Sequence, residues 1–395
     1  MKVSVIGQGY VGLPLALAIS EIGHEVFGID SNINVVKSLN SGKSHIEDIS
    51  NEQITNTVTS GSYIATNDYA VVAKSEVVIV CVPTPLTKNK LPDLTFLVSA
   101  LESISFNLNS GSLVIIESTV EPGTTRNLIL PLILKNKKDS MPDFELAFSP
   151  ERIDPRNDKW KLRNTPKLVS GLTQAASDRA LKFYSEFVDE VYLCETVETA
   201  ETAKLLENSF RFINISFINE LSIFCYKLGI DISKVINAAS TKPYGFMPFY
   251  PSIGVGGHCI PVDPIYLANA AKVVGAPTRF IDLADKINQE MPGYFVGRAE
   301  EKLGGLRHKR VLVVGVSYKP NVADVRETPV EALISGLKKK GAQVSWNDEL
   351  VKEWNGEKSV TLSNDFDLAI IATPHDYLDL TKLGNVPILN TRGSI

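Results

Sequence analysis

The chain has 395 residues, of which 44% are hydrophobic and 22% charged, and its formal net charge is -5 at pH 7. This composition is typical of a globular protein of two or three domains that needs neither metals nor disulfides for its core. The negative charge argues against nucleic acid as a partner, because nucleic-acid-binding proteins usually carry a basic surface. No apolar run is long enough to predict a transmembrane helix, so no membrane association is expected.

The four cysteines are Cys81, Cys194, Cys225 and Cys259. None forms a C-x-x-C pair, so neither a zinc ribbon nor a thioredoxin motif is present. So few cysteines in so long a chain suit a reducing compartment. The chain also begins with a strand-like run rather than the apolar segment of a signal peptide, and we therefore expect a cytoplasmic protein.

Apolar runs alternate with helix-like stretches in the first part of the chain. These runs are nearly continuous, as in parallel strands that are covered on both faces. They read KVSVIG, EVFGID, EVVIVCVP, SLVIIEST and ELAFSPER. Strands that alternate with helices predict stacked βαβ units, so residues 1–194 are expected to form a doubly wound, Rossmann-like domain.

Residues 195–228 contain neither glycine nor proline, and Gly229 follows, which predicts one long helix with a glycine stop. Its second half, FRFINISFINELSIFCYKL, is apolar on most faces, so the helix is either a spine between domains or a subunit interface. A second strand-turn-helix begins at residues 309–320. We therefore predict an α/β fold with two Rossmann-like doubly wound domains, the second at 299–395, joined by a central helical domain at 195–298.

Gly7, Gly9 and Gly12 form a G-x-G-x-x-G pattern between a predicted strand and a predicted helix. Such glycines allow a tight turn, close approach of the backbone to a pyrophosphate, and close packing of helix on strand. The next strand ends in Asp30, whose carboxylate can accept from a ribose 2′-hydroxyl and would repel a 2′-phosphate. The pattern predicts NAD rather than NADP, with FAD as a minor rival.

Polar side chains follow three of the predicted strands: Thr84, then Ser118 and Thr119, then Glu151 and Arg152. Each alone could simply end a strand. Because ligands bind outside the carboxyl ends of the strands in an open parallel sheet, the three groups together predict a site at this edge.

Lys204 and Asn208 lie four residues apart on the predicted long helix and share a face, and Arg211 is close to the same line. An ordinary solvated face is the alternative. Their neighbours Leu205 and Phe212 are apolar, however, and a lysine that is buried needs a partner or a task.

The segment GVGGHCIPVDP, residues 254–264, combines glycines with His258, Cys259 and Asp263. A zinc site is not expected, because structural zinc needs four ligands and catalytic zinc three. The glycines could form a structural turn with positive φ, or they could present Cys259 as a nucleophile. The spacing alone does not decide between these two interpretations.

Taken together, several of these segments identify the chain as similar to the nucleotide-sugar 6-dehydrogenases of the UDP-glucose/GDP-mannose dehydrogenase family. The matching segments read GQGYVGLPLA, CVPTPLTKNKLPDLT, ESTVEPGTT, FSPERIDP, AETAKLLENSFRFINISFINEL, GVGGHCIPVDP and YKPNVADVRETP. The resemblance implies that two NAD molecules in succession oxidise the C6 alcohol of a UDP-sugar to a carboxylate. It also implies a homodimer through the long helix, and a nucleotide-sugar that lies between the first and third domains.

The same resemblance implies roles for individual residues. Cys259 would form a thiohemiacetal and then a thioester with the sugar. The other implied catalytic residues are Lys204 and Asn208 for the oxyanion, Thr119 and Asp263 for water, and Glu151 as the general base. The expected cofactor-binding residues are Gly7, Gly9, Tyr10, Val11, Gly12, Asp30, Pro83, Thr84, Ser118, Thr119 and Arg326. The expected substrate-binding residues are Glu151, Arg152, Lys204, Asn208, Arg211, Tyr250, Gly254, Gly256, Gly257, His258 and Lys319.

Within the family, the segment TKPYGFMPFYPSIGVGGHC resembles members that oxidise UDP-N-acetylglucosamine, with UDP-glucose and UDP-N-acetylmannosamine as alternatives. Two features depart from the family pattern. PSIG replaces a Pro-Gly-Pro-Gly run, and Pro243 stands where many members place an arginine that reaches the partner subunit. A simple two-electron dehydrogenase and a NAD-sensing module are further alternatives, but neither needs Cys259.

Overall fold

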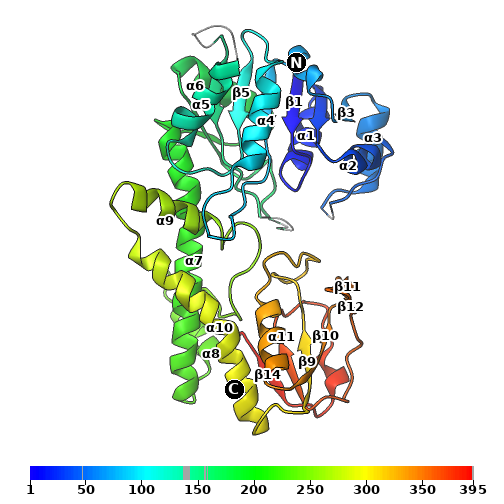
Figure 1. Cartoon of the computed structure of the whole chain (residues 1–395), viewed down its shortest axis with the longest axis vertical. Helices are drawn as coiled ribbons and strands as arrows, with labels where there is room; N and C mark the ends of the chain where they lie inside the picture. The colour runs from blue at the N-terminus through cyan, green and yellow to red at the C-terminus, as the bar shows by residue number, and fades with distance from the viewer. Residues whose placement is uncertain (47, 137–142, 155–156, 158, 394–395) are drawn as a thin grey trace. The chain divides into compact units, whose positions relative to one another are not determined.

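The computed structural model describes all residues except 47, 137–142, 155–156, 158 and 394–395 (Figure 1). It divides into two compact units, Met1–Leu206 and Glu207–Ile395. Both units are α/β structures, as the sequence predicts. The domain boundaries at 194 and 298 stay predictions.

The first unit is built on an eight-stranded sheet of order β3-β2-β1-β4-β5-β6-β7-β8. Its strands are β1 (Lys2–Ile6), β2 (Glu25–Ile29), β3 (Tyr63–Thr66), β4 (Val77–Val80), β5 (Leu113–Ile116), β6 (Glu145–Phe148), β7 (Lys167–Gly171) and β8 (Val191–Leu193). Strands β1 to β6 are parallel, and β7 runs antiparallel to β6. The strand order reverses beside β1, between β1 and β4, which is where a doubly wound sheet binds its ligand.

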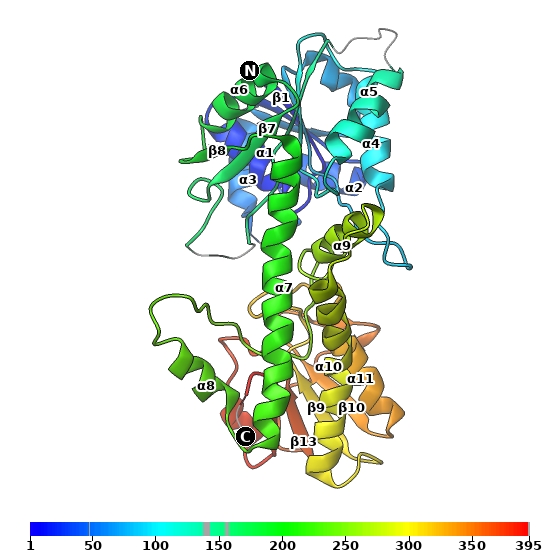
Figure 2. The same cartoon turned by 90° about the vertical axis from the view of Figure 1, so that its left-hand side faces the viewer.

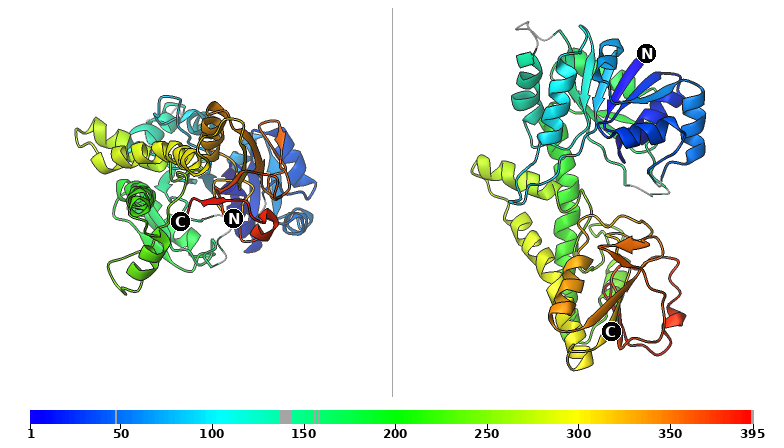
Figure 3. Two further views of the ribbon diagram at one scale, coloured as in Figure 1. Left: turned by 90° about the horizontal axis from the view of Figure 1, so that it is seen from below. Right: turned by 45° about the vertical axis from the view of Figure 1, so that its right-hand side comes forward.

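Helices cover both faces of this sheet (Figure 3). They are α1 (Gly12–Glu21), α2 (Ile33–Asn40), α3 (Asn51–Thr59), α4 (Thr95–Ser105), α5 (Leu130–Asn136) and α6 (Gln174–Tyr184), with short helical turns η1 (Tyr69–Lys74) and η2 (Thr125–Ile129). One buried apolar cluster packs α1, α3 and α6 on the sheet, and a second packs α4 and α5 on the opposite face. Burial on both faces explains why the strands are apolar at nearly every position.

The predicted long helix is confirmed as α7 (Val197–Lys227), which Figure 2 shows along its whole length. It ends where Gly229 adopts a positive φ of 69°, and the Ile230 N–H closes the last turn onto the Cys225 carbonyl. One face is buried, with Phe212 fully covered, whereas Phe210, Phe217 and Phe224 are exposed. Within one chain, α7 is therefore not buried on every side.

The second unit continues with α8 (Ile232–Ala239), α9 (Asp263–Val273), α10 (Arg279–Leu303) and α11 (Val330–Lys339). Its parallel sheet has the order β10-β9-β13-β14 and comprises β9 (Arg310–Val314), β10 (Gln343–Asn347), β13 (Leu368–Ile371) and β14 (Ile388–Asn390). The hairpin β11 (Glu353–Trp354) and β12 (Glu357–Lys358) and the turn η3 (Leu380–Leu383) complete it. The α/β prediction is confirmed: the first sheet is parallel except at β7, which pairs antiparallel with β6, the second sheet is parallel, and one long helix is present.

In the part of the chain that the structure describes, no helix combines the length and the apolarity needed to cross a bilayer. Among the same residues, no group of three or more His, Cys, Asp or Glu side chains is placed to hold a metal ion.

Candidate active site

The glycine turn after β1 has the geometry that a dinucleotide requires. Gly7 has a φ of +89°, which favours glycine. A Cβ on Gly12 would lie 1.8 Å from the Gly7 carbonyl oxygen, whereas a Cβ on Gly9 would meet nothing within 4 Å. The three glycines thus provide a tight turn, close packing of α1, and open space for a pyrophosphate.

Asp30 follows β2 and is fixed beside this turn. One carboxylate oxygen accepts from the Gln8 backbone N–H at 2.9 Å, and the other accepts from the Asn32 N–H at 2.8 Å. A carboxylate has about four lone-pair sites, so acceptors remain for ribose hydroxyls. Tyr10 is exposed and Val11 is half-buried in the same turn. These residues fit NAD, which they would hold by its ribose and its pyrophosphate.

The segments that follow β4 and β5 lie at the same sheet edge. Thr84 is buried, Thr119 is half-buried and Pro83 is exposed. The Ser118 hydroxyl donates to the Val82 carbonyl at 2.7 Å, and thereby ties the two segments together. Ser118 therefore has a structural partner in addition to its predicted cofactor role.

The sequence analysis missed a buried cluster of charges at this edge, centred on Lys167 of β7. The Lys167 ammonium lies 2.9 Å from a Glu117 carboxylate oxygen and 3.3 Å from a Glu151 oxygen. The Tyr184 hydroxyl donates to the same Glu117 oxygen. The Lys167 and Glu117 side chains are 4% and 0% exposed, and that of Glu151 is 13% exposed. Glu151 is therefore the member of the cluster that faces solvent.

The two carboxyl groups of the cluster have opposite pKa shifts. Burial raises the pKa of Glu117, and the nearby Lys167 offsets only part of this increase. Burial also acts to raise the pKa of Glu151, but Lys167, the Ile153 N–H and the Lys204 ammonium outweigh it, so that the pKa of Glu151 is lowered. Glu151 is therefore ionised at neutral pH, as a general base must be.

In the second unit, the glycines of the 254–258 loop are explained by close contacts. A Cβ on Gly257 would lie 2.6 Å from the Tyr318 ring, and the φ of Gly257 is +85°. A Cβ on Gly256 would lie 2.7 Å from the Glu327 carbonyl oxygen. The Gly257 N–H donates to the Arg326 carbonyl at 3.2 Å. These glycines are therefore needed for the packing of this loop against residues 318–329.

Cys259 directly follows these glycines and is exposed, whereas Cys81, Cys194 and Cys225 are buried. Its carbonyl accepts from the Asp263 N–H at 2.9 Å, in the turn that leads into α9. The loop thus combines both interpretations left open by the sequence: a packed glycine turn and an accessible thiol.

Asp263 opens α9, is buried, and accepts from the Asn208 amide at 2.6 Å. Lys204 lies one turn before Asn208 on α7 and is also buried. Burial lowers the pKa of His258, and the nearby Arg326 lowers it further, which favours the neutral imidazole.

The remaining predicted residues lie in varied surroundings. Arg211 and Tyr250 are exposed. Arg152 donates to the Pro166 carbonyl at 2.6 Å, and Arg326 forms an ion pair with Asp324. The predicted site residues of the second unit are Asn208, Arg211, Tyr250, Gly254, Gly256, Gly257, His258, Cys259, Asp263, Lys319 and Arg326, and the others belong to the first unit.

A matched pair of glycine variants tests the cofactor turn. Gly9→Ala is expected to leave the melting temperature unchanged, because its Cβ meets no protein atom within 4 Å. It should weaken NAD binding by about tenfold or more, since the methyl group occupies the space left for the pyrophosphate. Calorimetric titration with NAD measures this. Gly297→Ala on α10, which also meets nothing within 4 Å, is the control and should bind NAD normally. Equal NAD affinity in both variants would contradict the assignment.

A doubly wound sheet with a dinucleotide turn, together with an exposed thiol in the second unit, defines an NAD-dependent oxidoreductase. Comparison with known proteins refines this class. Three domains of the UDP-glucose/GDP-mannose dehydrogenase family match: the NAD binding domain at residues 1–188, the central domain at 198–290 and the UDP binding domain at 312–391. The UDP-N-acetyl-D-glucosamine 6-dehydrogenase of Pseudomonas aeruginosa is 36% identical over 89% of this chain and 83% of its own length.

Solved structures agree with the sequence comparison. The UDP-D-ManNAc dehydrogenase of Pyrococcus horikoshii has a TM-score of 0.90 at 31% identity, covering 99% of this chain and 95% of that one. A UDP-glucose dehydrogenase from Pyrobaculum islandicum has a TM-score of 0.91 at 26% identity, covering 99% and 94%. The chain belongs to the UDP-glucose/GDP-mannose dehydrogenase family. It is a nucleotide-sugar 6-dehydrogenase that uses NAD and takes a UDP-sugar as its substrate.

Proposed function

We propose that the substrate is a UDP-N-acetylhexosamine, with UDP-N-acetylglucosamine in first place, and that its C6 alcohol is oxidised to the carboxylate. The observation that supports a four-electron rather than a two-electron oxidation is the exposed thiol of Cys259, because a single hydride transfer does not need a thiol. The segment TKPYGFMPFYPSIGVGGHC and the named relative from Pseudomonas aeruginosa support the sugar. UDP-glucose and UDP-N-acetylmannosamine are the alternatives, because other relatives carry those names.

The proposed reaction has two oxidations and one hydrolysis. The first oxidation removes the hydroxyl proton and a hydride from C6 and leaves an aldehyde. The Cys259 thiolate then adds to the aldehyde carbon, and the thiohemiacetal so formed loses a second hydride to become a thioester. Attack by water breaks the C–S bond, releases the carboxylate and returns the thiolate. NAD, one molecule for each hydride, supplies the electron acceptor when bound.

The surroundings of each residue support its proposed role. Glu151 has a lowered pKa and two backbone N–H groups on one carboxylate oxygen, which supports its proposed role as proton acceptor. The Asn208 amide has two N–H donors and gives one to Asp263, so the second can stabilise an oxyanion together with the Lys204 ammonium. Asp263 and Thr119 are proposed to position the water.

A substrate panel with NAD tests the proposal. We expect the highest kcat/KM with UDP-N-acetylglucosamine, compared with UDP-N-acetylmannosamine, UDP-N-acetylgalactosamine and UDP-glucose, and two NADH per sugar. One NADH per sugar would indicate a simple two-electron dehydrogenase, and none with any sugar would indicate a NAD-sensing module. A higher kcat/KM for UDP-glucose would reassign the sugar and leave the four-electron reaction in place.

We also propose a homodimer through α7. Phe210, Phe217 and Phe224 are exposed on this helix at 46%, 57% and 57%, and large exposed phenyl groups in a row are typical of a subunit interface. Light scattering is expected to give twice the chain mass, and Phe217→Glu is expected to halve it. A monomeric wild-type protein would refute the dimer.

The four cysteines, none of which is in a disulfide, support a cytoplasmic location.

A further inference from the structure

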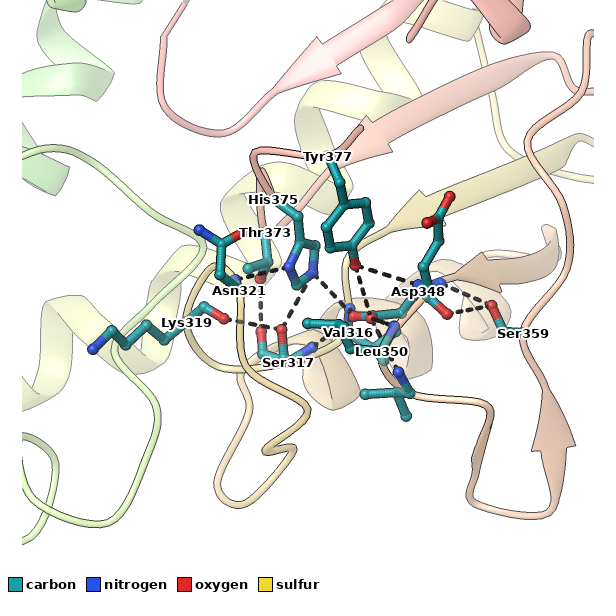
Figure 4. A network of polar contacts seen from close by, with 12 residues as sticks. Val316, Ser317, Lys319, Asn321, Asp348, Leu350, Ser359, Thr373, His375 and Tyr377 are labelled. Carbon is teal, nitrogen blue, oxygen red and sulfur yellow. Dashed lines mark hydrogen bonds and ion pairs between the residues drawn. The ribbon is translucent and has the colours of Figure 1, made fainter. Parts of the chain in front are cut away.

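A buried polar network lies at the carboxyl ends of β9, β10 and β13 in the second unit, and His375 is at its centre (Figure 4). The side chains of His375 and Asp348 are both 0% exposed. Neither residue was selected in the sequence analysis. In an open parallel sheet this edge is where ligands bind, so a network here bears on the UDP-sugar.

The hydrogen bonds around His375 allow only one neutral tautomer. The Asn321 backbone N–H, whose donor role is fixed, donates to Nδ1 at 2.9 Å. Nδ1 must therefore carry the lone pair, and the ring proton must be on Nε2. Nε2 lies 3.1 Å from an Asp348 carboxylate oxygen and 3.4 Å from the Ser317 hydroxyl, both of which can accept that proton.

Asp348 connects the imidazole to the rigid sheet. The oxygen that faces His375 also accepts from the Val316 N–H at 3.0 Å, and the other accepts from the Leu350 N–H at 3.0 Å. Burial acts to raise the pKa of Asp348, but the hydrogen bonds from His375 and from backbone N–H groups outweigh it and lower the pKa. An ionised Asp348 thus accepts the Nε2 proton and fixes the orientation of the ring.

On its other side, the network holds the segment 317–328 at two points that flank Lys319. His375 holds the backbone of Asn321, which has a φ of +63°. The Ser317 hydroxyl donates to the Lys319 carbonyl at 3.0 Å. Asn321 and Asp376 also form two reciprocal hydrogen bonds, at 2.6 and 3.0 Å.

The same segment supports the thiol loop. A Cβ on Gly257 would lie 2.6 Å from its Tyr318 ring, and its Arg326 carbonyl accepts from the Gly257 N–H. The position of segment 317–328 therefore determines both the backbone at Lys319 and the packing of the loop that precedes Cys259.

We propose that His375, in its Nε2–H tautomer, is a positioning residue that holds segment 317–328 in the conformation that binds the nucleotide of the substrate. His375 is buried and acts through Asn321 and Ser317 rather than by touching the ligand. The inference rests on the proposed function in one respect, namely that the chain binds a UDP-sugar, for which the family resemblance implies a contact with Lys319.

Two isosteric variants separate the two ring nitrogens. His375→Asn keeps an acceptor near the position of Nδ1, and His375→Gln keeps a donor near the position of Nε2. We expect His375→Gln to weaken UDP binding by about tenfold, as for the loss of one buried hydrogen bond, and His375→Asn to weaken it by about threefold or less. The NAD affinity of both variants should be unchanged, because the dinucleotide turn belongs to the first unit. The KM for the sugar should rise more than kcat falls.

Calorimetry with UDP and NAD, together with kcat and KM, gives these values. Wild-type UDP affinity in both variants, or equal losses in both, would overturn the positioning role and leave the proposed function intact. A wild-type protein that does not bind UDP would overturn both. If the variants do not fold, ¹⁵N NMR of the wild-type imidazole decides, because the Nδ1–H tautomer or a charged ring at neutral pH would contradict the proposal.

Discussion

Replacing Cys259 with serine is expected to lower uronic acid formation on the order of 10³-fold or more, the range seen when a covalent nucleophile is lost. A serine hydroxyl is a much weaker nucleophile at neutral pH, and no thioester can form from it. Because Cys259 is exposed, the free energy of unfolding and the NAD affinity should stay within wild-type limits. Chromatographic measurement of the acid, together with the NADH yield per sugar, checks the result.

The matched control for this variant is Cys225→Ser, which changes a buried thiol on α7. Its activity per folded molecule should be that of the wild type, even if its stability falls. Uronic acid release by Cys259→Ser at near wild-type rate would contradict the covalent mechanism.

Replacing Lys167 with methionine is expected to lower the free energy of unfolding by about 3–5 kcal/mol at neutral pH, because it breaks a buried ion pair by removing one partner. Glu117 and Glu151 would then share a buried site without their ammonium group. Urea unfolding measures the change. Lys182→Met, which removes an exposed lysine on α6, is the control and should change the free energy by at most about 0.5 kcal/mol.

The loss of unfolding free energy in Lys167→Met should depend on pH in a defined direction. The pKa of Glu117 is raised in the folded state, so its ionisation opposes folding fully above the folded pKa. This penalty shrinks as the pH falls below the folded pKa and is gone below the unfolded pKa. Glu151 has a lowered pKa and contributes stability above its unfolded pKa, which is lost in acid. Removing Lys167 raises the pKa of both carboxyl groups, so the destabilisation should shrink as the pH is lowered from neutral towards the unfolded pKa of glutamate.

A double variant distinguishes the ion pairs from simple loss of packing. Lys167→Met with Glu117→Gln should recover part of the lost stability, because only one buried carboxylate then remains. The acid limb of kcat/KM should also move to higher pH in Lys167→Met, as Glu151 loses its cation. Additive losses in the double variant, with an unchanged pH profile, would show that Lys167 contributes by packing alone.

Features that depend on local pattern could be predicted from the sequence. The glycine turn, Asp30 and the long helix follow from residues that are close along the chain, and the structure agrees with each of them. Strands β3, β7 and β8 of the first sheet were missed, because YIAT and KLVSG mix apolar with polar residues and VYL is only three residues long.

The buried polar groups could not be predicted, because their partners come from distant segments. Lys167 meets Glu117 and Glu151 only once β5, β6 and β7 are side by side. The only sign of this charge cluster in the sequence was the presence of a lysine and a glutamate within apolar, strand-like runs. Similarly, the role of His375 depends on Asn321, which is remote in sequence.

The contrast between one accessible thiol and three covered ones also determines how the protein is damaged. Peroxide and alkylating reagents react with thiolates that they can reach, so Cys259 is the first point of attack and the buried cysteines are protected by packing. Oxidation to the sulfenic acid would stop turnover without unfolding the chain, and a small-molecule thiol would reverse it. The accessibility that the proposed reaction requires of Cys259 thus makes its sulfur the most oxidant-sensitive of the four cysteine sulfurs.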